Sequence, residues 1–366
     1  NDPYEPPPDA LTVALLPLYG HQALQARFAD TVRRSALPGS ILLQGSPGIG
    51  KQQLALWLGR LLLCERPDQA PCGTCKSCRF ALEMRHPDLH WFFPRPRPKN
   101  LDTDSVKEDM AEAIAARMEA GGIYEPPGGD EAIFIATTHA LVQIASVSPA
   151  MGKRKVLVVG DAHRMASQEG SEQAANAFLK LLEEPPADTT IILTSGEPGA
   201  LLPTIKSRVV TVLVPPLSDA DARAFLADQR VAATLDSGGM STEELVRFAA
   251  GAPGRIIARE ALAAARTQAR RILDAAAATD RGARMRVALM QGGSGARGRF
   301  SDTLDALTEL LHERARSATM SGNERLATGA ARAIEAVERA KELAYGNVSP
   351  QLLAASLLQQ LATLVG

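Results

Sequence analysis

Residues 40–51 read SILLQGSPGIGK, and this stretch predicts a strand, a glycine-rich loop and the first residue of a helix. The apolar run at 41–43 is typical of a buried strand, and large apolar residues recur at helical spacing between Leu54 and Leu62. Between strand and helix, a G-x-x-x-x-G-K loop lets backbone N–H groups turn toward a phosphate, and its lysine can reach the β- and γ-phosphates of a nucleotide. The predicted phosphate-binding residues are Gly45, Gly48, Gly50 and Lys51.

The position after Lys51 departs from the usual phosphate loop. Serine or threonine normally stands there and holds Mg²⁺ through its hydroxyl group, whereas this chain has Gln52. Glutamine carries an amide oxygen on a longer side chain, which does not fit the same coordination point. The alternative interpretation is a glycine-rich turn without a ligand. We therefore predict an ancestral phosphate loop. Whether ATP or ADP occupies it stays open.

A second buried strand, KVLVV at 155–159, is followed by Gly160, Asp161, Ala162 and His163. An ATPase of this type has an acidic pair here, one carboxylate for Mg²⁺ and one that polarises the attacking water. Asp161 keeps the first carboxylate, but Ala162 has no group that accepts a proton. His163 could act as a base, although a histidine beside a strand end is more often a packed or capping residue. The sequence therefore predicts that this chain does not hydrolyse ATP.

Short apolar runs and helical patterns alternate as far as residue 215, which is the rhythm of a parallel sheet covered by helices. Further strands are expected at 190–194 and 209–214, and an amphipathic helix at 174–182 is ended by two prolines. After the proline pair at 215–216 every pattern is helical. The predicted organisation is an α/β domain at 1–215 with an insertion at about 95–130, a small helical domain at 216–279 and a terminal helical domain at 280–366.

All cysteines of the chain lie in one short window with the spacing C-x7-C-x2-C-x2-C, at Cys64, Cys72, Cys75 and Cys78. Four thiolates at this spacing can close a tetrahedral Zn²⁺ shell, because an x2 turn places paired sulfurs on one metal. Two local disulfides are the weaker alternative, since the chain shows no signal peptide. A shell of four cysteines has no open position. We therefore predict a structural zinc module at 64–78 that folds a loop and does not activate water.

The composition argues against a general polyanion-binding protein and against a membrane-spanning protein. The net charge of the 366-residue chain is −1, so the chain as a whole lacks the positive charge of a general polyanion-binding protein. No apolar run approaches the ~20 residues that span a bilayer. Residues 1–10, NDPYEPPPDA, are proline-rich and acidic, which indicates a flexible leader and not a targeting signal. Reduced cysteines without an export signal then point to the cytoplasm and away from a membrane.

The run AANAFLKLLEEPP at 174–186 follows DAHRM at 161–165. Together they resemble the bacterial clamp-loader AAA+ subunits of DNA polymerase III, in which the first run reads close to A-N-A-L-L-K-x-L-E-E-P-P. The cysteine module behind the phosphate-loop helix belongs to the same pattern. The matches extend over about 11–366, apart from the insertion. The shorter matches are YGH at 19–21, Thr194-Ser195 on the sensor strand, SRV at 207–209 in place of S-R-C, and NVSPQL at 347–352.

The resemblance implies an AAA+ domain, a helical lid at 216–279 and a C-terminal collar at 280–366. The collar joins subunits into a five-membered ring with three motor subunits (gamma/tau) and a delta subunit. That assembly opens the sliding clamp and places it on primed DNA when ATP is bound. The resemblance also implies that Asp161 and Thr194 belong to the nucleotide site.

Two kinds of subunit share this pattern. The motor subunits keep an intact G-K-T/S loop and an Asp-Glu pair, and delta-prime subunits commonly have neither intact. Gln52 and Ala162 therefore favour a delta-prime-like subunit, which would work in the nucleoid-associated replisome.

Arg208 takes its interpretation from the resemblance. On its own, an arginine at this position is most simply a surface charge. In the family, the arginine of the S-R-C element is aimed at a neighbour's ATP site, where a permanently charged guanidinium contacts two phosphate oxygens. We therefore predict that Arg208 acts in trans from a subunit that does not hydrolyse ATP itself. Two other hypotheses stay open: an active gamma/tau-like ATPase in which Gln52 and His163 replace the lost groups, and a zinc-dependent nucleic-acid-binding module.

Overall fold

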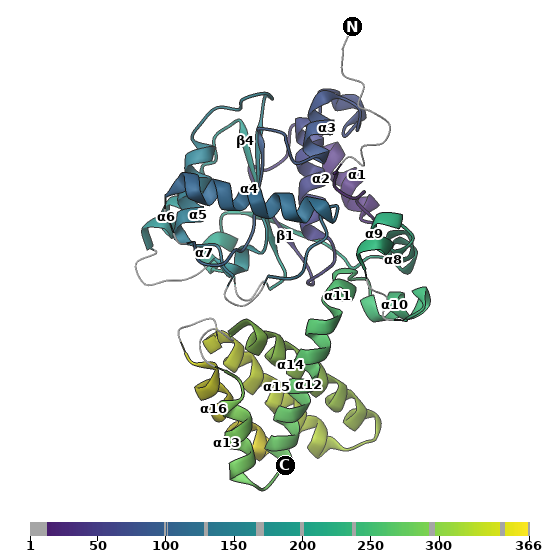
Figure 1. The fold of residues 1–366 in the computed structure, drawn as a ribbon, viewed down its shortest axis with the longest axis vertical. Coiled ribbons are helices and arrows are strands. Elements are labelled where there is room, and N and C mark those ends of the chain that lie inside the picture. Colours follow the sequence, from purple (N-terminus) through teal and green to yellow (C-terminus); the bar gives the residue numbers. More distant parts are fainter. Residues whose placement is uncertain are drawn as a thin grey trace. The chain divides into compact units, whose positions relative to one another are not determined.

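The computed structural model describes residues 13–98, 100, 102–127, 131–165, 172–197, 201–235, 239–292, 297–344 and 348–364. The predicted leader at 1–10 lies outside these residues, as do parts of the insertion and Asn347. The sheet belongs to one compact unit and the C-terminal helices to another (Figure 1). The first unit comprises residues 1–94, 98–126 and 133–257, and the second comprises residues 95–97, 127–132 and 258–366.

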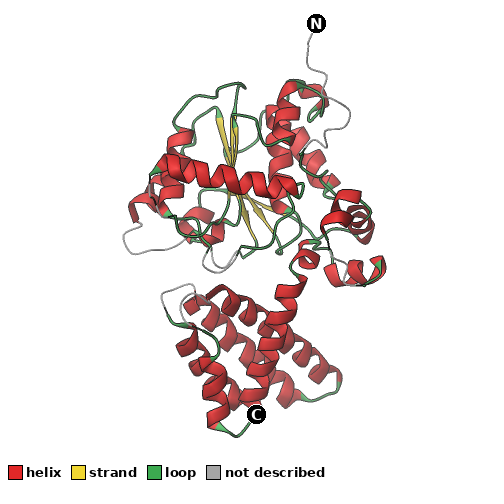
Figure 2. Ribbon diagram, viewed as in Figure 1, coloured by secondary structure: helices red, strands yellow, loops and turns green. Residues whose placement is uncertain are grey.

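A five-stranded parallel sheet forms the centre of the first unit (Figure 2). Its strand order is β2-β3-β4-β1-β5, and each neighbouring pair is parallel. The side chains of β1, β3 and β4 are almost all buried, as expected for the central strands of a covered parallel sheet. This arrangement confirms the predicted α/β fold. The strands are β1 (Ser40–Gln44), β2 (Leu89–Phe92), β3 (Lys155–Val159), β4 (Thr189–Ser195) and β5 (Val210–Leu213).

Strand β2 was missing from the sequence-based prediction. It has four residues, LHWF, and the histidine interrupts an apolar run that is already short for a strand. In the sheet, β2 pairs with β3 so that Trp91 lies opposite Val158 and Phe92 opposite Val159. Strand β2 therefore carries Trp91 to the end of the sheet at which β3 leads into Asp161.

Helices α1 to α7 lie around the sheet. Helix α2 begins at Lys51, the last residue of the phosphate loop, and packs against β1, β3 and β4. Its buried side chains include Leu54, Leu58 and Leu61, which recur at the spacing of one helix face. The helices are α1 (Gln22–Arg33), α2 (Lys51–Leu63), α3 (Lys76–Leu82), α4 (Thr103–Glu119), α5 (Ile135–Ala145), α6 (Glu172–Glu183) and α7 (Pro203–Lys206), with 3-10 turns η1 (Pro67–Gln69) and η2 (Ala162–Arg164).

The predicted insertion contains the long helix α4, which packs against α5 (Figure 1). Asp102 caps its start, because its side chain accepts a hydrogen bond from the backbone N–H of Ser105 at 2.9 Å. One face of the helix joins the hydrophobic core of the first unit. The insertion is therefore integral to the core of the sheet unit. The buried residues of α4 are Val106, Met110, Ala113 and Met118.

Four short helices follow β5 and stay in the first unit. Helix α10 begins with a capping box in which the side chains of Ser241 and Glu244 each accept a hydrogen bond from the other's backbone N–H. Its buried residues Leu245 and Ala249 pack with Ile256 in a small core of their own. These helices are α8 (Asp219–Leu226), α9 (Gln229–Thr234), α10 (Thr242–Ala249) and α11 (Gly254–Ile257).

The second unit is helical and has an alanine- and leucine-rich core. Helix α12 packs against α14 and α16, because its buried residues face that core. The division between the units at 257/258 thus differs from the predicted domain boundary at 279/280. Among the helices that the structure describes, none has the length and apolar character of a membrane span. The helices are α12 (Arg259–Ala277), α13 (Arg281–Leu289), α14 (Arg297–Met320), α15 (Glu324–Ala344) and α16 (Pro350–Leu364).

Candidate functional site

The phosphate loop lies at the C-terminal end of β1, which is where parallel α/β sheets bind their ligands. Gly48 has φ +79° and Gly50 has φ +88°, conformations that glycine adopts without strain. Helix α11 begins directly against the loop, because the N–H of Gly254 donates to the carbonyl oxygen of Gly48 at 2.9 Å. A Cβ added to Gly254 would lie 2.5 Å from the Cα of Gly48. This contact therefore admits no side chain.

Lys51, the predicted phosphate-binding lysine, is bonded within its own loop. Its Nζ donates to the carbonyl oxygen of Ser46 at 2.7 Å, and its side chain is buried. Burial lowers the pKa of Lys51 to about 8, and the charge of Asp161 partly opposes that shift. The lysine is thus present, and in this conformation it is bonded to a backbone carbonyl of its own loop.

Gln52 joins two elements of the sheet through its amide. Its Nε2 donates to Oδ2 of Asp161 at 2.9 Å, and its Oε1 accepts from the indole N–H of Trp91 at 2.9 Å. The amide also fills the space above Gly160, where an added Cβ would lie 2.4 Å from the amide oxygen. Gln52 is buried, so these two hydrogen bonds satisfy polar groups that water does not reach.

Asp161 follows β3 in a left-handed conformation with φ 48°. Its backbone N–H donates to Oγ1 of Thr194 at 3.0 Å, and Thr194 itself is fully buried on β4. Burial raises the pKa of Asp161, and the charges of Lys51, Arg164 and Arg117 oppose that effect. The structure therefore brings Lys51, Asp161 and Thr194 together, with Lys51 and Thr194 buried, while Gly48 of the loop is exposed.

Two residues beside these groups were not singled out from the sequence. Trp91 lies on the strand that the prediction missed, and Arg117 lies on the insertion helix α4. A tryptophan in a short apolar run is most simply a core residue, so its hydrogen bond to Gln52 had no local signal. Arg117 is the only arginine of α4, which is the feature that could have drawn attention to it.

His163 is held next to the site in a form unsuited to a base. Its Nδ1 lies 3.4 Å from Oγ of Ser195, and its Nε2 lies 3.9 Å from a carboxylate oxygen of Glu197. Burial lowers the pKa of His163 to about 3, and the charges of Arg164 and Lys51 add to the effect. A neutral imidazole of such low basicity takes up protons poorly near pH 7.

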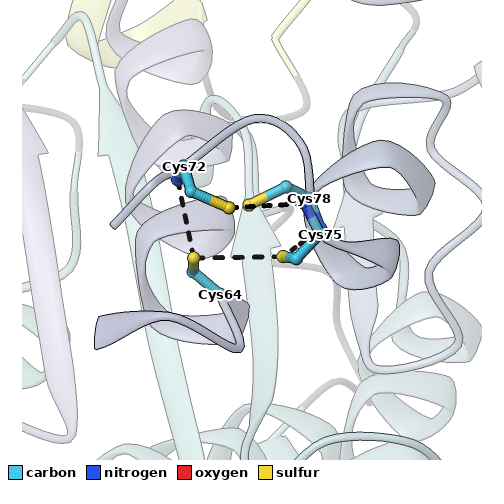
Figure 3. A group of neighbouring side chains, drawn as sticks. All are labelled: Cys64, Cys72, Cys75 and Cys78. Atoms are coloured by element: carbon cyan, nitrogen blue, oxygen red, sulfur yellow. Dashed lines mark hydrogen bonds between the residues drawn. The ribbon is translucent and has the colours of Figure 1, made fainter. Parts of the chain in front are cut away.

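The four cysteines form a second site behind α2 (Figure 3). All four sulfurs lie within 4.8 Å of one another. Cys64 ends α2, and Cys75 caps the start of α3 by accepting from the N–H of Cys78 at 3.4 Å. Since Cys78 lies on the first turn of that helix, the x2 spacing brings both sulfurs to one point. The group could hold a metal ion.

The surroundings of the sulfurs differ. Backbone N–H donors at Cys75 and Thr74 lower the pKa of Cys72 to about 5, which favours its thiolate. Burial instead raises the pKa of Cys78. Glu65 fixes the loop around them, because its carboxylate accepts from both the backbone N–H and the hydroxyl of Ser77. A bound cation would favour the thiolate form of all four cysteines.

Arg208 lies apart from these groups, between α7 and β5. Its Nε donates to Oε2 of Glu183 at 3.2 Å, and its Nη1 donates to the carbonyl oxygen of Thr204 at 3.0 Å and to the hydroxyl of Ser207. Glu183 is the last residue of α6. The side chain of Arg208 remains 29% exposed, so its outer edge can still meet another molecule.

Comparison with known proteins identifies the family. A family model described as DNA polymerase III, delta subunit, matches residues 20–218, which is more than half of the chain. The chain belongs to this family. The delta-subunit family match covers the phosphate loop, the cysteine cluster, Asp161 and Arg208, and it confirms the resemblance drawn from the sequence motifs.

Individual relatives of this delta-family chain are similar over part of their length. DNA polymerase III subunit delta' of Pseudomonas aeruginosa is 32% identical over 230 residues, covering 63% of this chain and 58% of that protein. Subunit delta' of Escherichia coli is 29% identical over 223 residues, covering 60% and 53%. Subunit tau of Salmonella typhimurium is 26% identical over 190 residues, covering 52% and 23%. The chain thus spans about half the length of the delta' relatives it matches.

Proposed function

We propose that this chain is a delta-prime-like subunit of the DNA polymerase III clamp loader that does not hydrolyse ATP and supplies Arg208 to a neighbouring ATP site. The observation that carries the proposal is the Gln52 amide, bonded to both Asp161 and Trp91. In an active site of this type, a hydroxyl at that position and the aspartate would share Mg²⁺. Here the aspartate already has an amide partner, and the adjacent Ala162 offers no carboxylate for water.

The alternative, an active gamma/tau-like ATPase, is favoured by one feature, the retained Lys51. The hydrogen bond of Lys51 to the Ser46 carbonyl and its lowered pKa both argue against phosphate binding by Lys51 in this conformation. His163 would have to replace the missing glutamate, and its pKa of about 3 makes it a poor base. The proposal therefore keeps ATP or ADP as a possible ligand of the loop and assigns hydrolysis to neighbouring subunits.

The experiment for hydrolysis is ATP turnover by the purified chain with Mg²⁺ present. We expect a background rate. The matched comparison is the chain carrying Gln52→Thr and Ala162→Glu, which restores the hydroxyl and the carboxylate. A gain in that variant would show that the two positions limit the wild type. Robust turnover by homogeneous wild-type protein would contradict the proposal.

Arg208 needs the assembled ring, because the site it would serve lies on another subunit. The partners we expect are gamma/tau motor subunits, a delta subunit and the sliding clamp, with primed DNA reached through the complex. Arginines that act in this way contribute ~10³–10⁵ in rate where they have been measured. In a reconstituted loader we expect Arg208→Ala to lower the clamp- and DNA-stimulated ATPase rate. The loss should be partial, because the other ATP sites keep their own arginines.

A control variant sits two residues away. Lys206→Ala removes an exposed cation from the end of α7 and should leave the loader's ATPase unchanged. Arg208→Lys should rescue poorly, because an ammonium group lacks the planar fork that contacts two oxygens. Loading of clamps at wild-type rates by the Arg208→Ala loader would contradict the role in trans.

For the cysteine cluster the proposal names structural Zn²⁺. A tetrahedral ion with Zn–S bonds of about 2.3 Å sets its sulfurs about 3.8 Å apart. The distance between the sulfurs of Cys64 and Cys75 is 4.0 Å, so small shifts would suffice. Cys64, Cys72, Cys75 and Cys78 would then fill the whole shell, and the ion would connect the end of α2 to the start of α3.

A further inference from the structure

The guanidinium group of Arg208 is held by three hydrogen bonds within its own chain. Its Nε donates to Oε2 of Glu183 at 3.2 Å, and its Nη1 donates to the carbonyl oxygen of Thr204 at 3.0 Å and to the hydroxyl of Ser207 at 3.2 Å. Its third nitrogen, Nη2, has no hydrogen bond to any residue that the structure describes. Because the group is planar, these bonds fix its plane and leave the two N–H donors of Nη2 for another molecule.

The partners of Arg208 differ in kind. Thr204 and Ser207 belong to the same turn as the arginine, and the Ser207 hydroxyl itself donates to the carbonyl oxygen of Thr204 at 3.0 Å. Glu183 lies 25 residues earlier in the chain, at the end of α6. Across the described part of the chain, its carboxylate is the only one that forms an ion pair with Arg208. Glu183 therefore connects the guanidinium group to a separate helix.

The backbone on both sides of Glu183 is anchored to the sheet. The carbonyl oxygen of Leu182 accepts a hydrogen bond from the hydroxyl of Ser40, the first residue of β1, at 2.9 Å, and the Leu182 side chain is buried. Pro185 packs against Gly39, where an added Cβ would lie 2.6 Å from Cγ of the proline. The carboxylate that holds Arg208 is thus mounted on a fixed element, as the support of a functional group requires.

Helix α6 gains nothing from an acidic residue at its end. The C-terminal end of a helix carries partial negative charge, so a carboxylate there is unfavourable and a cation is preferred. Glu183 ends α6, Glu184 follows it, and both are exposed. Within the described ranges only Glu183 of these two forms an ion pair. The contact with Arg208 therefore gives Glu183 a role that its own helix does not.

Arg208 lies at the end of the sheet opposite to the chain's own phosphate loop. Strand β5 begins two residues after it and runs parallel to β1, with Val210 opposite Ile41. The phosphate loop follows the other end of β1, and the five residues of that strand span roughly 15 Å. An arginine side chain does not bridge that distance, so the free Nη2 is open to a second molecule and not to the chain's own loop.

We infer that Glu183 is the positioning residue of Arg208, and that it holds Nε so that Nη2 is preset to contact a phosphate oxygen of the neighbouring ATP site. The inference rests on the proposed function, since that function assigns Arg208 to the neighbouring site. A long side chain loses rotamer freedom when it is fixed. Fixing it before the neighbour arrives removes part of that cost from the reaction.

The test uses the clamp- and DNA-stimulated ATPase of a reconstituted loader. The Arg208-dependent rate is the difference in kcat between loaders with the wild-type chain and with Arg208→Ala. An exposed ion pair shifts an equilibrium by up to about fivefold, so Glu183→Ala should lower this rate roughly two- to fivefold, with the KM for ATP unchanged. In the Arg208→Ala background, Glu183→Ala should have no further effect.

The neighbouring glutamate supplies the matched control. Glu184→Ala removes a carboxylate from the same end of α6 and should leave kcat unchanged. Glu183→Gln keeps an oxygen that can accept from Nε, so its rate should lie between those of wild type and Glu183→Ala. All three variants should unfold within about 2 °C of wild type, because an exposed pair adds little stability.

The sign of the change separates positioning from masking. A carboxylate that masked Arg208 would occupy a donor that the phosphate needs, and Glu183→Ala or Glu183→Gln would then raise the rate above wild type. That rise would overturn the inference. A wild-type rate in Glu183→Ala, beside a lowered rate in Arg208→Ala, would overturn the inference and leave the proposed function standing. A wild-type rate in Arg208→Ala would contradict the proposed function, and the inference with it.

A second measurement follows the side chain in the isolated full-length chain. With ¹⁵N-labelled arginine, the Nε–H signal of Arg208 is assigned by its loss in Arg208→Lys. It should exchange slowly with water in wild type and in Glu184→Ala, and rapidly in Glu183→Ala, because only that variant removes its acceptor. Equal exchange rates in all three proteins would overturn the inference.

Discussion

The cysteine cluster and the phosphate loop lie at opposite ends of helix α2. They differ in whether their polar groups have partners within the chain. In the cluster, four groups of the same kind face one point within 4.8 Å. At the loop, Lys51, Gln52 and Asp161 each have a partner of opposite polarity within the chain. A site built for a ligand brings like groups together, since only the ligand compensates them. A site that works without one pairs its groups with each other.

The pKa values distinguish one cysteine of the cluster from the rest. N–H donors lower the pKa of Cys72 to about 5, which favours its thiolate, whereas burial raises the pKa of Cys64 and Cys78. At the loop, burial lowers the pKa of Lys51 and raises that of Asp161, so both groups are shifted toward their neutral forms. Removing an external ligand should therefore matter greatly at the cluster and little at the loop.

The largest effect is expected from breaking the cluster. Cys75→Ser removes one of the four predicted zinc ligands and the sulfur that caps α3. Structural zinc supplies on the order of 10 kcal/mol of apparent folding free energy in small zinc-binding peptides, so the 64–78 module should unfold locally. Metal content by mass spectrometry should fall to background, and limited proteolysis should cut within the module.

The control for this variant is Thr74→Ser, which keeps the hydroxyl beside Cys72. It should retain both metal and protease resistance. Zinc content equal to wild type in the Cys75→Ser protein would rule out a four-cysteine shell.

The next largest effect should come from Gln52→Leu. The change keeps much of the volume but leaves the Trp91 N–H and the Asp161 carboxylate without their amide partner. Each buried group without its partner costs about 1–3 kcal/mol, so unfolding in urea should show a loss of roughly 2–5 kcal/mol. Gln69→Leu, on the exposed η1 turn, should stay within about 0.5 kcal/mol. A neutral Gln52→Leu would mean that the loop does not depend on internal pairing.

A smaller loss of folding stability is expected when the pH is lowered. His163 has its pKa lowered to about 3 by burial, and its side chain is 6% exposed. The unfolded chain, with an ordinary histidine pKa near 6.5, binds the proton more readily, so stability falls as pH drops below about 6.5. This group should cost on the order of 1–2 kcal/mol between pH 7 and pH 5.

The measurement is the slope of unfolding free energy against pH in wild type and in His163→Gln. The variant should have the shallower slope, whatever its stability at pH 7. His139→Gln, on an exposed face of α5, is the control for the removal of a histidine. Parallel curves for wild type and His163→Gln would show that this histidine is not buried neutral.

The smallest expected effect is the change in Tm of the wild-type chain on adding Mg²⁺. With ATP present, exchanging EDTA for Mg²⁺ should move the Tm of the wild-type chain by less than about 1 °C, because Gln52 already bonds to the aspartate that would share the ion. The same exchange in Gln52→Thr should give a larger rise if the hydroxyl restores metal binding. A clear Mg²⁺-dependent rise in wild type would remove the contrast between the two sites.

Local patterns were enough to predict much of this architecture. The glycine loop, four of the five strands and the convergence of the cysteines depend on neighbours in sequence, where spacing determines geometry. The metal itself and the role of Arg208 stay predictions. Strand β2 was not predicted, because four residues that include a histidine form too weak a strand pattern. The 279/280 boundary differed because helical periodicity continues on both sides of it, and only packing assigns α12 to the second unit.

The internal pairing of the phosphate loop could not be predicted, because its partners are far apart in the chain. Gln52 bonds to Trp91 39 residues later and to Asp161 109 residues later. The sequence showed that the metal-binding hydroxyl was gone. It held no signal for what replaced it, because hydrogen bonds between distant side chains leave no periodicity.

The backbone contact between Gly48 and Gly254 has a consequence for biosynthesis. The two glycines are 254 − 48 = 206 residues apart, and strand β5, next to the loop's own strand, ends at Leu213. At about 5–20 residues per second, a ribosome needs roughly 10–40 s to make the intervening chain. During that interval the loop exists without its hydrogen bond to α11. A nucleotide that meets Lys51 during synthesis therefore meets a loop that lacks this contact.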